Sequence, residues 1–320
     1  MSMKWWNSYW FRPAPLLDLA ILRIVAVGLQ LWLMLVPSNI LKELYIRASQ
    51  PDNLYTPLPI LKILLSPFGW GYRPSLDVLI VLYWITIVAG TLALIGLRTN
   101  LSLLIFAIGS VILQAFAWSF GEIHHTMQIM MIALSVLALS PSGQVLSVDA
   151  WRRRHLNPAG NRKSNWSEIL YAESKFARWP ILLIQWFFVL MYLSAVISKM
   201  AVSGTEWMNG YTLQYYLIRD GMRWSSPLAL WASQYHLFIM LLQWVIVIIQ
   251  STFWVAVIWP PARWIYIPLG LSFHLGILLT LRANFYTWIA LYVVFIPWTH
   301  FFKSLLSRFH STTEKFASTV

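Results

Sequence analysis

The chain contains no cysteine, and charged residues make up only 11% of its 320 positions. Without cysteine, disulfide bridges, thiolate nucleophiles and cysteine-ligated metals are excluded. Soluble domains carry about 25% charged residues, whereas 59% of this sequence is hydrophobic. The composition therefore indicates an integral membrane protein that contacts the lipid bilayer.

Several motifs of common chemistry are also missing. The sequence has no phosphate-binding glycine loop, no Ser-His-Asp elbow and no His-Glu-x-x-His helix, so nucleotide hydrolysis, acyl transfer and zinc hydrolysis have no support. The first 13 residues are polar and aromatic, and the apolar stretch after them lacks a clear small-residue cleavage site, so no cleavable signal peptide is expected. No metal site is predicted.

Eight apolar segments approach or exceed the length that a bilayer requires, which is about 20 residues in a helix. They predict an all-α, polytopic protein with about eight transmembrane helices in a single domain over residues 1–320. The predicted helices cover residues 14–36, 76–97, 101–120, 124–139, 177–200, 237–259, 264–281 and 285–298. Trp and Tyr residues near the ends of these segments suit the interface between membrane and water.

The basic residues predict the orientation, because cytoplasmic connections carry an excess of Lys and Arg. With eight spans both termini share one side, and that side also holds the basic connection 141–178 and the tail 299–320. Both termini are therefore expected in the cytoplasm, and the connection 37–75 outside it. The net charge of +12 then follows from topology and contact with anionic lipids, and no nucleic-acid partner is expected.

Lys199 is the most informative single residue. It lies in the run PILLIQWFFVLMYLSAVISKM, where the nearest charged residues are Arg178 and Glu206. A lone ammonium in so apolar a helix is costly. Because desolvation disfavours the charged form of an amine, such a nitrogen is able to accept a proton. Lys199 is therefore the first candidate for a general base.

Two further charges lie in the first apolar segment. Asp18 and Arg23 are five positions apart, and they could reach one another or neighbouring helices. We predict an intramembrane ion pair that fixes helix packing, with an anion or quinone contact as the alternative.

Three histidines lie in or beside apolar segments. His124 and His125 are adjacent, so their rings point in different directions and a shared metal is not expected. His274 lies in the middle of a helix, where a packed, hydrogen-bonded histidine is the simpler interpretation. However, His125, His274 and Lys199 come from three different helices and are all expected in the outer half of the membrane. This placement favours a shared site.

The segment around Lys199 carries a more specific pattern. Tyr192, Lys199, Trp207, Gly210 and Tyr211 resemble a tyrosine, a lysine and a Trp-x-x-Gly-Tyr-like turn of the vitamin K-dependent gamma-carboxylases and their bacterial relatives, the HTTM-domain proteins. Other segments resemble this family in the same order along the chain: ILRIVAVG, GLRTNLSLLIF, IHHTMQIMMIALSVL, LSVDAWRRRH and SFHLGILLTLRANFYTWIAL. The resemblance runs from about residue 13 to residue 298.

The resemblance implies roles for individual residues. Lys199 matches the catalytic base, and His125 matches the histidine that supports the reacting quinone. His274 matches a histidine of the substrate region. The remaining matched or adjacent residues, His124, Tyr192, Trp207 and Tyr211, are expected to bind the substrate or the quinone.

The resemblance also implies a reaction. A reduced quinone similar to vitamin K hydroquinone is deprotonated by the lysine, O2 adds to it, and the strongly basic alkoxide that forms enables CO2 to carboxylate a glutamyl peptide or protein. A phenol with a pKa near 10 is well matched to a neutral amine in a dry site. The expected location is a bacterial inner membrane.

Two departures from the family pattern affect this expectation. First, the carboxylases have a large extracytoplasmic region after the last matched helices, and this sequence lacks that region. Second, Ser198 and Val196 replace a lysine and a glycine beside Lys199. Either the glutamyl substrate is small or separately presented, or quinol chemistry is kept without carboxylation. The alternatives are a non-catalytic binding or maturation factor for a lipid or peptide, and a transporter. The absence of an inverted repeat counts against the transporter.

Overall fold

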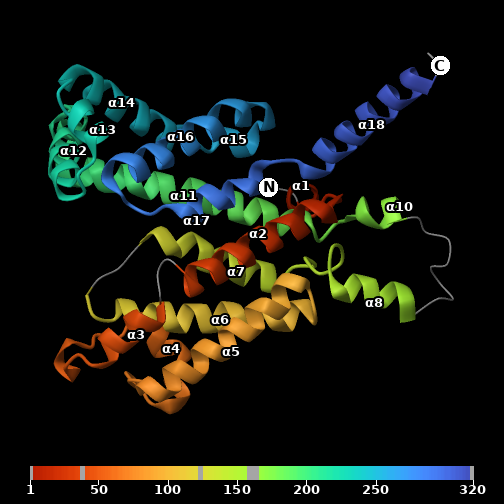
Figure 1. The fold of residues 1–320 in the computed structure, drawn as a ribbon, viewed down its shortest axis with the longest axis horizontal. Coiled ribbons are helices and arrows are strands. Elements are labelled where there is room, and N and C mark those ends of the chain that lie inside the picture. The colour runs from red at the N-terminus through yellow and green to blue at the C-terminus, as the bar shows by residue number, and fades with distance from the viewer. Residues whose placement is uncertain (1–2, 37–39, 122–124, 157–165, 318–320) are drawn as a thin grey trace. The chain divides into compact units, whose positions relative to one another are not determined.

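The structure is a computed structural model, and it describes residues 3–36, 40–121, 125–156 and 166–317 (Figure 1). The chain divides into two compact units. Unit 1 comprises Met1–Ile181 and Ile296–Val320, and unit 2 comprises Leu182–Phe295.

Unit 1 is helical, with one short two-stranded sheet in which β1 (Ala14–Pro15) pairs antiparallel with β2 (Glu173–Ser174). Its helices are α1 (Met3–Trp10), α2 (Leu16–Leu35), α3 (Ile40–Ala48), η1 (Asp52–Leu54), α4 (Pro59–Leu64), η2 (Ser66–Phe68), α5 (Leu76–Ile95), α6 (Thr99–Trp118), η3 (His125–Met127), α7 (Gln128–Ala138), α8 (Val148–Leu156), α10 (Trp166–Leu170) and α18 (Trp298–Ala317).

The centre of unit 1 is formed by α2, α5, α6 and α7. Helix α6 packs against α5 and α7, and α2 packs against the same two helices (Figure 1). Small residues bring α5 and α6 close together: a Cβ atom on Gly90 would lie 2.6 Å from the Phe106 ring, and one on Gly109 would lie 2.1 Å from the Thr86 hydroxyl. Such close approach is the usual means of helix association in membranes.

Arg23 is fully buried at the end of this helix group where α7 leads into α8. Its guanidinium donates to the carbonyl oxygens of Ser142, at 3.0 Å, and Leu146, at 2.5 Å. Gly96 lies against it with a φ of 73°, and a Cβ atom there would be 2.9 Å from Arg23 Nη1 and 2.3 Å from Ser147 Cβ. Arg23 therefore joins α2 to the loop before α8.

Asp149 holds the beginning of α6 in the same region. Its carboxylate accepts hydrogen bonds from the Arg98 nitrogen at 2.9 Å and from the Thr99 nitrogen and hydroxyl, both at 2.7 Å. Carboxylates are favourable at a helix N-terminus, where backbone N–H groups lack partners. Partial burial raises the pKa of Asp149, but these hydrogen bonds and the nearby Arg153 outweigh it, so the pKa lies below its ordinary value.

The predicted ion pair between Asp18 and Arg23 is wrong. Asp18 Oδ1 accepts instead from the Thr299 nitrogen at 2.7 Å and the Thr299 hydroxyl at 2.8 Å, which ties α2 to α18. Arg23 binds only the two backbone carbonyls. The reason is geometric, since five residues of an α-helix rotate a side chain by about 500°, which leaves the two about 140° apart.

Unit 2 is also helical, and α11 (Arg178–Ser203) runs into it from the last residues of unit 1. Its other helices are η4 (Gly204–Met208), α12 (Tyr211–Arg223), α13 (Pro227–Ala232), α14 (His236–Thr252), α15 (Val255–Ile258), η5 (Pro260–Ala262), α16 (Arg263–Leu281), α17 (Tyr286–Leu291) and η6 (Tyr292–Phe295). An aromatic cluster fills its core, with Phe188 5.2 Å from Trp288 and 5.3 Å from Phe295 between ring centroids.

The described residues contain five helices long and apolar enough to cross a membrane: Leu16–Leu35, Leu76–Ile95, Thr99–Trp118, Arg178–Met208 and Pro260–Leu281. A sixth span results if Tyr286–Phe295 and Trp298–Ser307 count as one. The predicted all-α membrane architecture is thus supported, but eight spans are not confirmed. Each predicted segment overlaps a helix, yet α7 has 11 residues and α14 has 17, both short of the usual spanning length.

We expect Asp149→Asn to destabilise the purified protein at pH 7 by about 1 kcal/mol, the usual effect of losing a helix cap. Because the folded-state pKa lies below the ordinary value of 3.8, the carboxylate stabilises the fold above that value. The contribution is lost as pH falls through the folded-state pKa. Thermal unfolding of wild type and variant should therefore converge below about pH 4.

Asp77→Asn is the matched control, since Asp77 lies exposed in the first turn of α5. It should change thermal stability little at any pH. A constant difference between wild type and Asp149→Asn from pH 7 to pH 3 would contradict the capping role of the Asp149 carboxylate.

Candidate functional site

A polar stripe runs along α11 in unit 2. Gln185, Tyr192 and Lys199 are spaced seven residues apart, which places them on one face of the helix at intervals of about 10.5 Å. Gln185 and Tyr192 are buried and Lys199 is half-buried. Each side chain therefore needs its own partner inside the protein.

Lys199 finds a neutral partner. Its Nζ donates to Gln250 Oε1 at 2.8 Å and lies 5.0 Å from the centroid of the Trp207 ring. No ion pair joins Lys199 to a carboxylate among the described residues. A carboxylate would fix the ammonium form, whereas an amide oxygen accepts a hydrogen bond from either the ammonium or the amine. The surroundings of Lys199 are thus compatible with both protonation states.

A second polar stripe lies on α14, where His236, Gln243 and Gln250 are also spaced seven residues apart. Gln243 donates from Nε2 to the Trp207 carbonyl at 2.6 Å, and Gln250 accepts from Lys199. Both glutamines are buried, and Gln243 Oε1 has no partner among the described residues. An acceptor is therefore left open beside Trp207.

The turn between α11 and α12 places Trp207 and Tyr211. Gly210 has a φ of 95°, and a Cβ atom there would lie 2.8 Å from the His236 ring, so a side chain would be strained and crowded. The Tyr211 ring lies 4.4 Å from the His236 ring between centroids, and His236 Nδ1 is 2.9 Å from Gln214 Oε1. The Trp-x-x-Gly-Tyr segment thus forms a turn that packs against the first residue of α14.

A second cluster surrounds Tyr192. Its hydroxyl is hydrogen-bonded to His274 Nε2 at 2.9 Å and to the Tyr292 hydroxyl. All three side chains are at most 3% exposed, and His274 Nδ1 has no partner among the described residues. When Tyr192 donates to Nε2, Nδ1 carries the hydrogen, and with the opposite orientation Nδ1 is an acceptor. His274 Nδ1 is therefore the open end of a short hydrogen-bonded chain.

Five predicted site residues lie together in unit 2: Tyr192, Lys199, Trp207, Tyr211 and His274. They do not form one cluster. Lys199 contacts Gln250 and Trp207. Tyr192, which is hydrogen-bonded to His274, lies about two helical turns from Lys199 along α11, a rise of about 10.5 Å.

The two adjacent histidines are different cases. His124 falls outside the described residues, and His125 opens η3 in unit 1. The proposed meeting of His125 with Lys199 stays a prediction.

The described part of the chain contains no group of three or more His, Asp or Glu side chains able to hold a metal ion.

The site thus consists of two clusters, one around Lys199 with Trp207, Gln243 and Gln250, and one around Tyr192 with His274 and Tyr292. The sequence analysis did not predict Gln243, Gln250 and Tyr292. For the glutamines a signal existed, because two amides seven residues apart in an apolar helix lie on one face.

Comparison with protein families places both clusters within one matched region. The model of the HTTM domain matches residues 11–300. The chain belongs to the HTTM-domain family. The matched region crosses both units and includes every residue of the two clusters. No curated protein and no solved structure matches this HTTM-family chain. The HTTM domain is associated with vitamin K-dependent carboxylase-like proteins, and the apolar helices agree with a membrane family.

The Tyr192 cluster depends on a close contact with α16. A Cβ atom on Gly270 would lie 2.1 Å from the Tyr292 hydroxyl oxygen and 2.8 Å from its Cζ. We expect Gly270→Ala to displace Tyr292 and to destabilise the protein by about 1–3 kcal/mol, the usual range for overpacking. Thermal unfolding in detergent measures the change.

Gly276→Ala is the matched control on the same helix, because no atom lies within 4 Å of its added Cβ. It should leave stability unchanged or slightly higher. Adding Tyr292→Phe to Gly270→Ala removes the atom of closest contact and should recover part of the loss. Equal effects of the two alanine substitutions would contradict the proposed contact.

Proposed function

We propose that the protein is a membrane enzyme that oxidises a reduced quinone, with Lys199 as the base that accepts a proton from the quinol hydroxyl. The observation that supports it most is the environment of Lys199. Its Nζ lies in an apolar span, hydrogen-bonded to the neutral Gln250 at 2.8 Å and next to the Trp207 ring. A base needs access to both protonation states, and this set of partners allows it.

The residues around Trp207 suit a quinol. A hydroquinone has two hydroxyl donors and an aromatic ring. Lys199 Nζ and the unpartnered Gln243 Oε1 are acceptors on side chains that both contact Trp207. The Trp207 indole offers a surface on which an aromatic ring could stack. We infer that these three residues hold the quinol, and that Lys199 Nζ receives its proton.

The Tyr192 cluster has a supporting role in this proposal. His274 Nδ1, the open end of the chain through Tyr192 and Tyr292, would donate a hydrogen bond to an oxygen of the second substrate. Such a fixed donor in a dry site stabilises developing negative charge. Tyr211 lies at the turn beside His236 and would border the quinol site. By resemblance, His125 would support the quinone.

The overall reaction that we propose follows the family resemblance. The quinol supplies the reducing equivalents, and O2 oxidises it to the quinone epoxide and water, so that one oxygen atom goes to each product. Carboxylation then replaces one hydrogen of a glutamyl side chain by the carboxylate of CO2, and that hydrogen leaves as a proton.

The proposed location is a bacterial inner membrane with both termini in the cytoplasm.

The direct test is quinol oxidation by the purified protein. With menadiol, O2, bicarbonate and a glutamyl peptide, we expect wild type to consume quinol. Lys199→Ala should lower turnover by about 10²–10⁴-fold, the range for removing a general base, with unchanged thermal stability. Absorbance reports quinol oxidation, and labelled CO2 incorporation into the peptide reports carboxylation.

Lys175→Ala is the matched control. Lys175 lies in unit 1 and not among the residues proposed to hold the quinol, and its Nζ lies 5.4 Å from the centroid of the Phe176 ring. It should retain full turnover. An active Lys199→Ala variant would exclude Lys199 as the base. Saturable menadiol binding without turnover in wild type would instead indicate a non-catalytic binding protein.

A further inference from the structure

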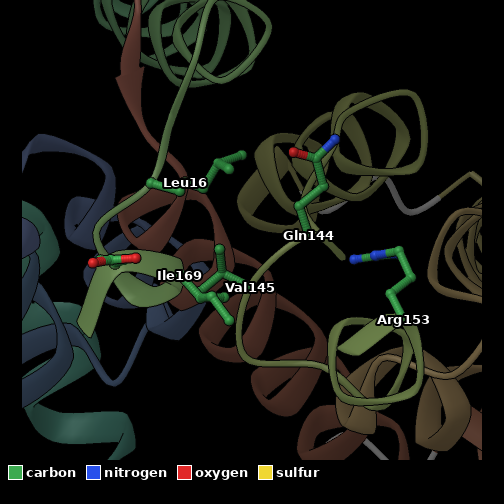
Figure 2. Close-up of a pocket in the computed structure, with 7 residues that line it drawn as sticks. Leu16, Gln144, Val145, Arg153 and Ile169 are labelled. Atoms are coloured by element: carbon green, nitrogen blue, oxygen red, sulfur yellow. The ribbon is translucent and has the colours of Figure 1, made fainter. Parts of the chain in front are cut away.

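Unit 1 contains a cavity of about 430 Å³ that the proposed function does not use. Its apolar lining includes Leu16, Val145 and Ile169, and its polar lining consists of Gln144, Arg153 and Glu168. Figure 2 shows the Arg153 guanidinium directed toward the space, with Leu16, Val145 and Ile169 across from it and the Gln144 amide pointing away from the guanidinium. The cavity therefore has the Arg153 guanidinium on one side and apolar side chains opposite it.

The position of the cavity along α2 matches the layer of a membrane in which lipid headgroups lie. Leu16 is the first residue of the membrane-spanning α2, so the cavity lies where this helix enters the apolar layer. Helix α1 of the same unit exposes Trp5 and Trp6, and the Arg178 side chain donates to the Tyr9 carbonyl at 2.6 Å. Tryptophans of this kind are typical of the interfacial layer. A volume equivalent to roughly 14 waters is large enough for a headgroup.

Arg153 offers free donors to this space. Its Nη2 donates to the Gly143 carbonyl at 2.9 Å, and the other guanidinium N–H groups have no hydrogen-bond partner among the described residues. Asp149 attracts Arg153 electrostatically, but the oxygens of Asp149 accept from Arg98 and Thr99. The planar guanidinium fork matches the geometry of phosphate oxygens, so arginine is common in phosphate sites.

Glu168 provides the opposite charge. It lines the same cavity, is exposed, and forms no ion pair with Arg153 in the part of the chain that the structure describes. Two charges of opposite sign that do not pair with each other suit a ligand that carries both signs. A primary ammonium can donate hydrogen bonds to a carboxylate, whereas a trimethylammonium has no N–H.

We propose that this cavity binds the headgroup of a phospholipid that carries a phosphate and a primary ammonium. The phosphate contacts Arg153 and Gln144, the ammonium contacts Glu168, and an acyl chain lies along Leu16, Val145 and Ile169. The site is independent of the quinol chemistry proposed for unit 2.

The test uses the purified full chain in detergent, titrated with dioleoyl phosphatidylethanolamine, phosphatidylcholine or phosphatidylglycerol, with the bound fraction measured by native mass spectrometry. We expect wild type to bind the ethanolamine lipid roughly tenfold more tightly than the choline lipid, the effect of one charge-assisted hydrogen bond. Glu168→Gln should abolish this preference and leave the glycerol lipid unaffected. Arg153→Gln should weaken binding of all three lipids.

Arg152→Gln and Glu173→Gln are the matched controls, since both residues are exposed near the site but do not line the cavity. They should bind as wild type does. If Arg153→Gln fails to fold, Arg153→Lys, which keeps the charge and loses the planar fork, should show a smaller loss for all three lipids, and Glu168→Gln tests the ammonium contact.

In the lipid titrations, three results would overturn the proposal: no preference for the ethanolamine lipid in wild type, equal losses in the control variants, or an unchanged preference in Glu168→Gln. Soluble phosphoethanolamine at the same concentration should not displace the lipid, because it lacks the acyl chain. Displacement would also count against a lipid as the occupant.

Discussion

The structure depends on one constraint: a polar group within an apolar, membrane-spanning helix needs a partner inside the protein, because hydrocarbon offers none. Each intramembrane charge described here meets it differently. Arg23 binds two backbone carbonyls, Asp18 binds the nitrogen and hydroxyl of Thr299, and Lys199 binds the amide of Gln250. Among the residues that the structure describes, no opposite charge forms an ion pair with any of the three. Neutral partners hold these side chains in place without neutralising them.

The same constraint has different consequences in the two units. In unit 1 the segments that resemble the family join helices: Arg23 holds the loop before α8, and Asp149 caps α6. Arg23 and Asp149 therefore have a structural role within this unit. In unit 2 the buried atoms without partners among the described residues include Gln243 Oε1 on α14 and His274 Nδ1 on α16. Since unpaired buried polar atoms are costly, a bound substrate would recover free energy at these positions.

Much of the fold could be predicted from the sequence, because composition and apolar segment length directly reflect the membrane. The two short helices α7 and α14 could not, since hydropathy shows where apolar residues are and not where the backbone breaks. The predicted Asp18–Arg23 pair does not form, because residues that are close in sequence on a helix can be separated by a rotation of about 140°. Lys199 was identified by its isolation. Its partner Gln250 was 51 residues away, and only the seven-residue spacing of Gln243 and Gln250 indicated a polar face.

The central claim is that Lys199 acts as a base because its partner is neutral. Gln250→Glu tests it most directly, as the new carboxylate would keep the hydrogen bond and hold Lys199 in its ammonium form. Quinol oxidation by the purified variant should fall at least tenfold, an ion-pair effect of about 1.4 kcal/mol or more, while thermal stability does not fall. Gln234→Glu adds the same charge at an exposed glutamine and should oxidise quinol at the wild-type rate. Unchanged quinol oxidation by Gln250→Glu would contradict the account.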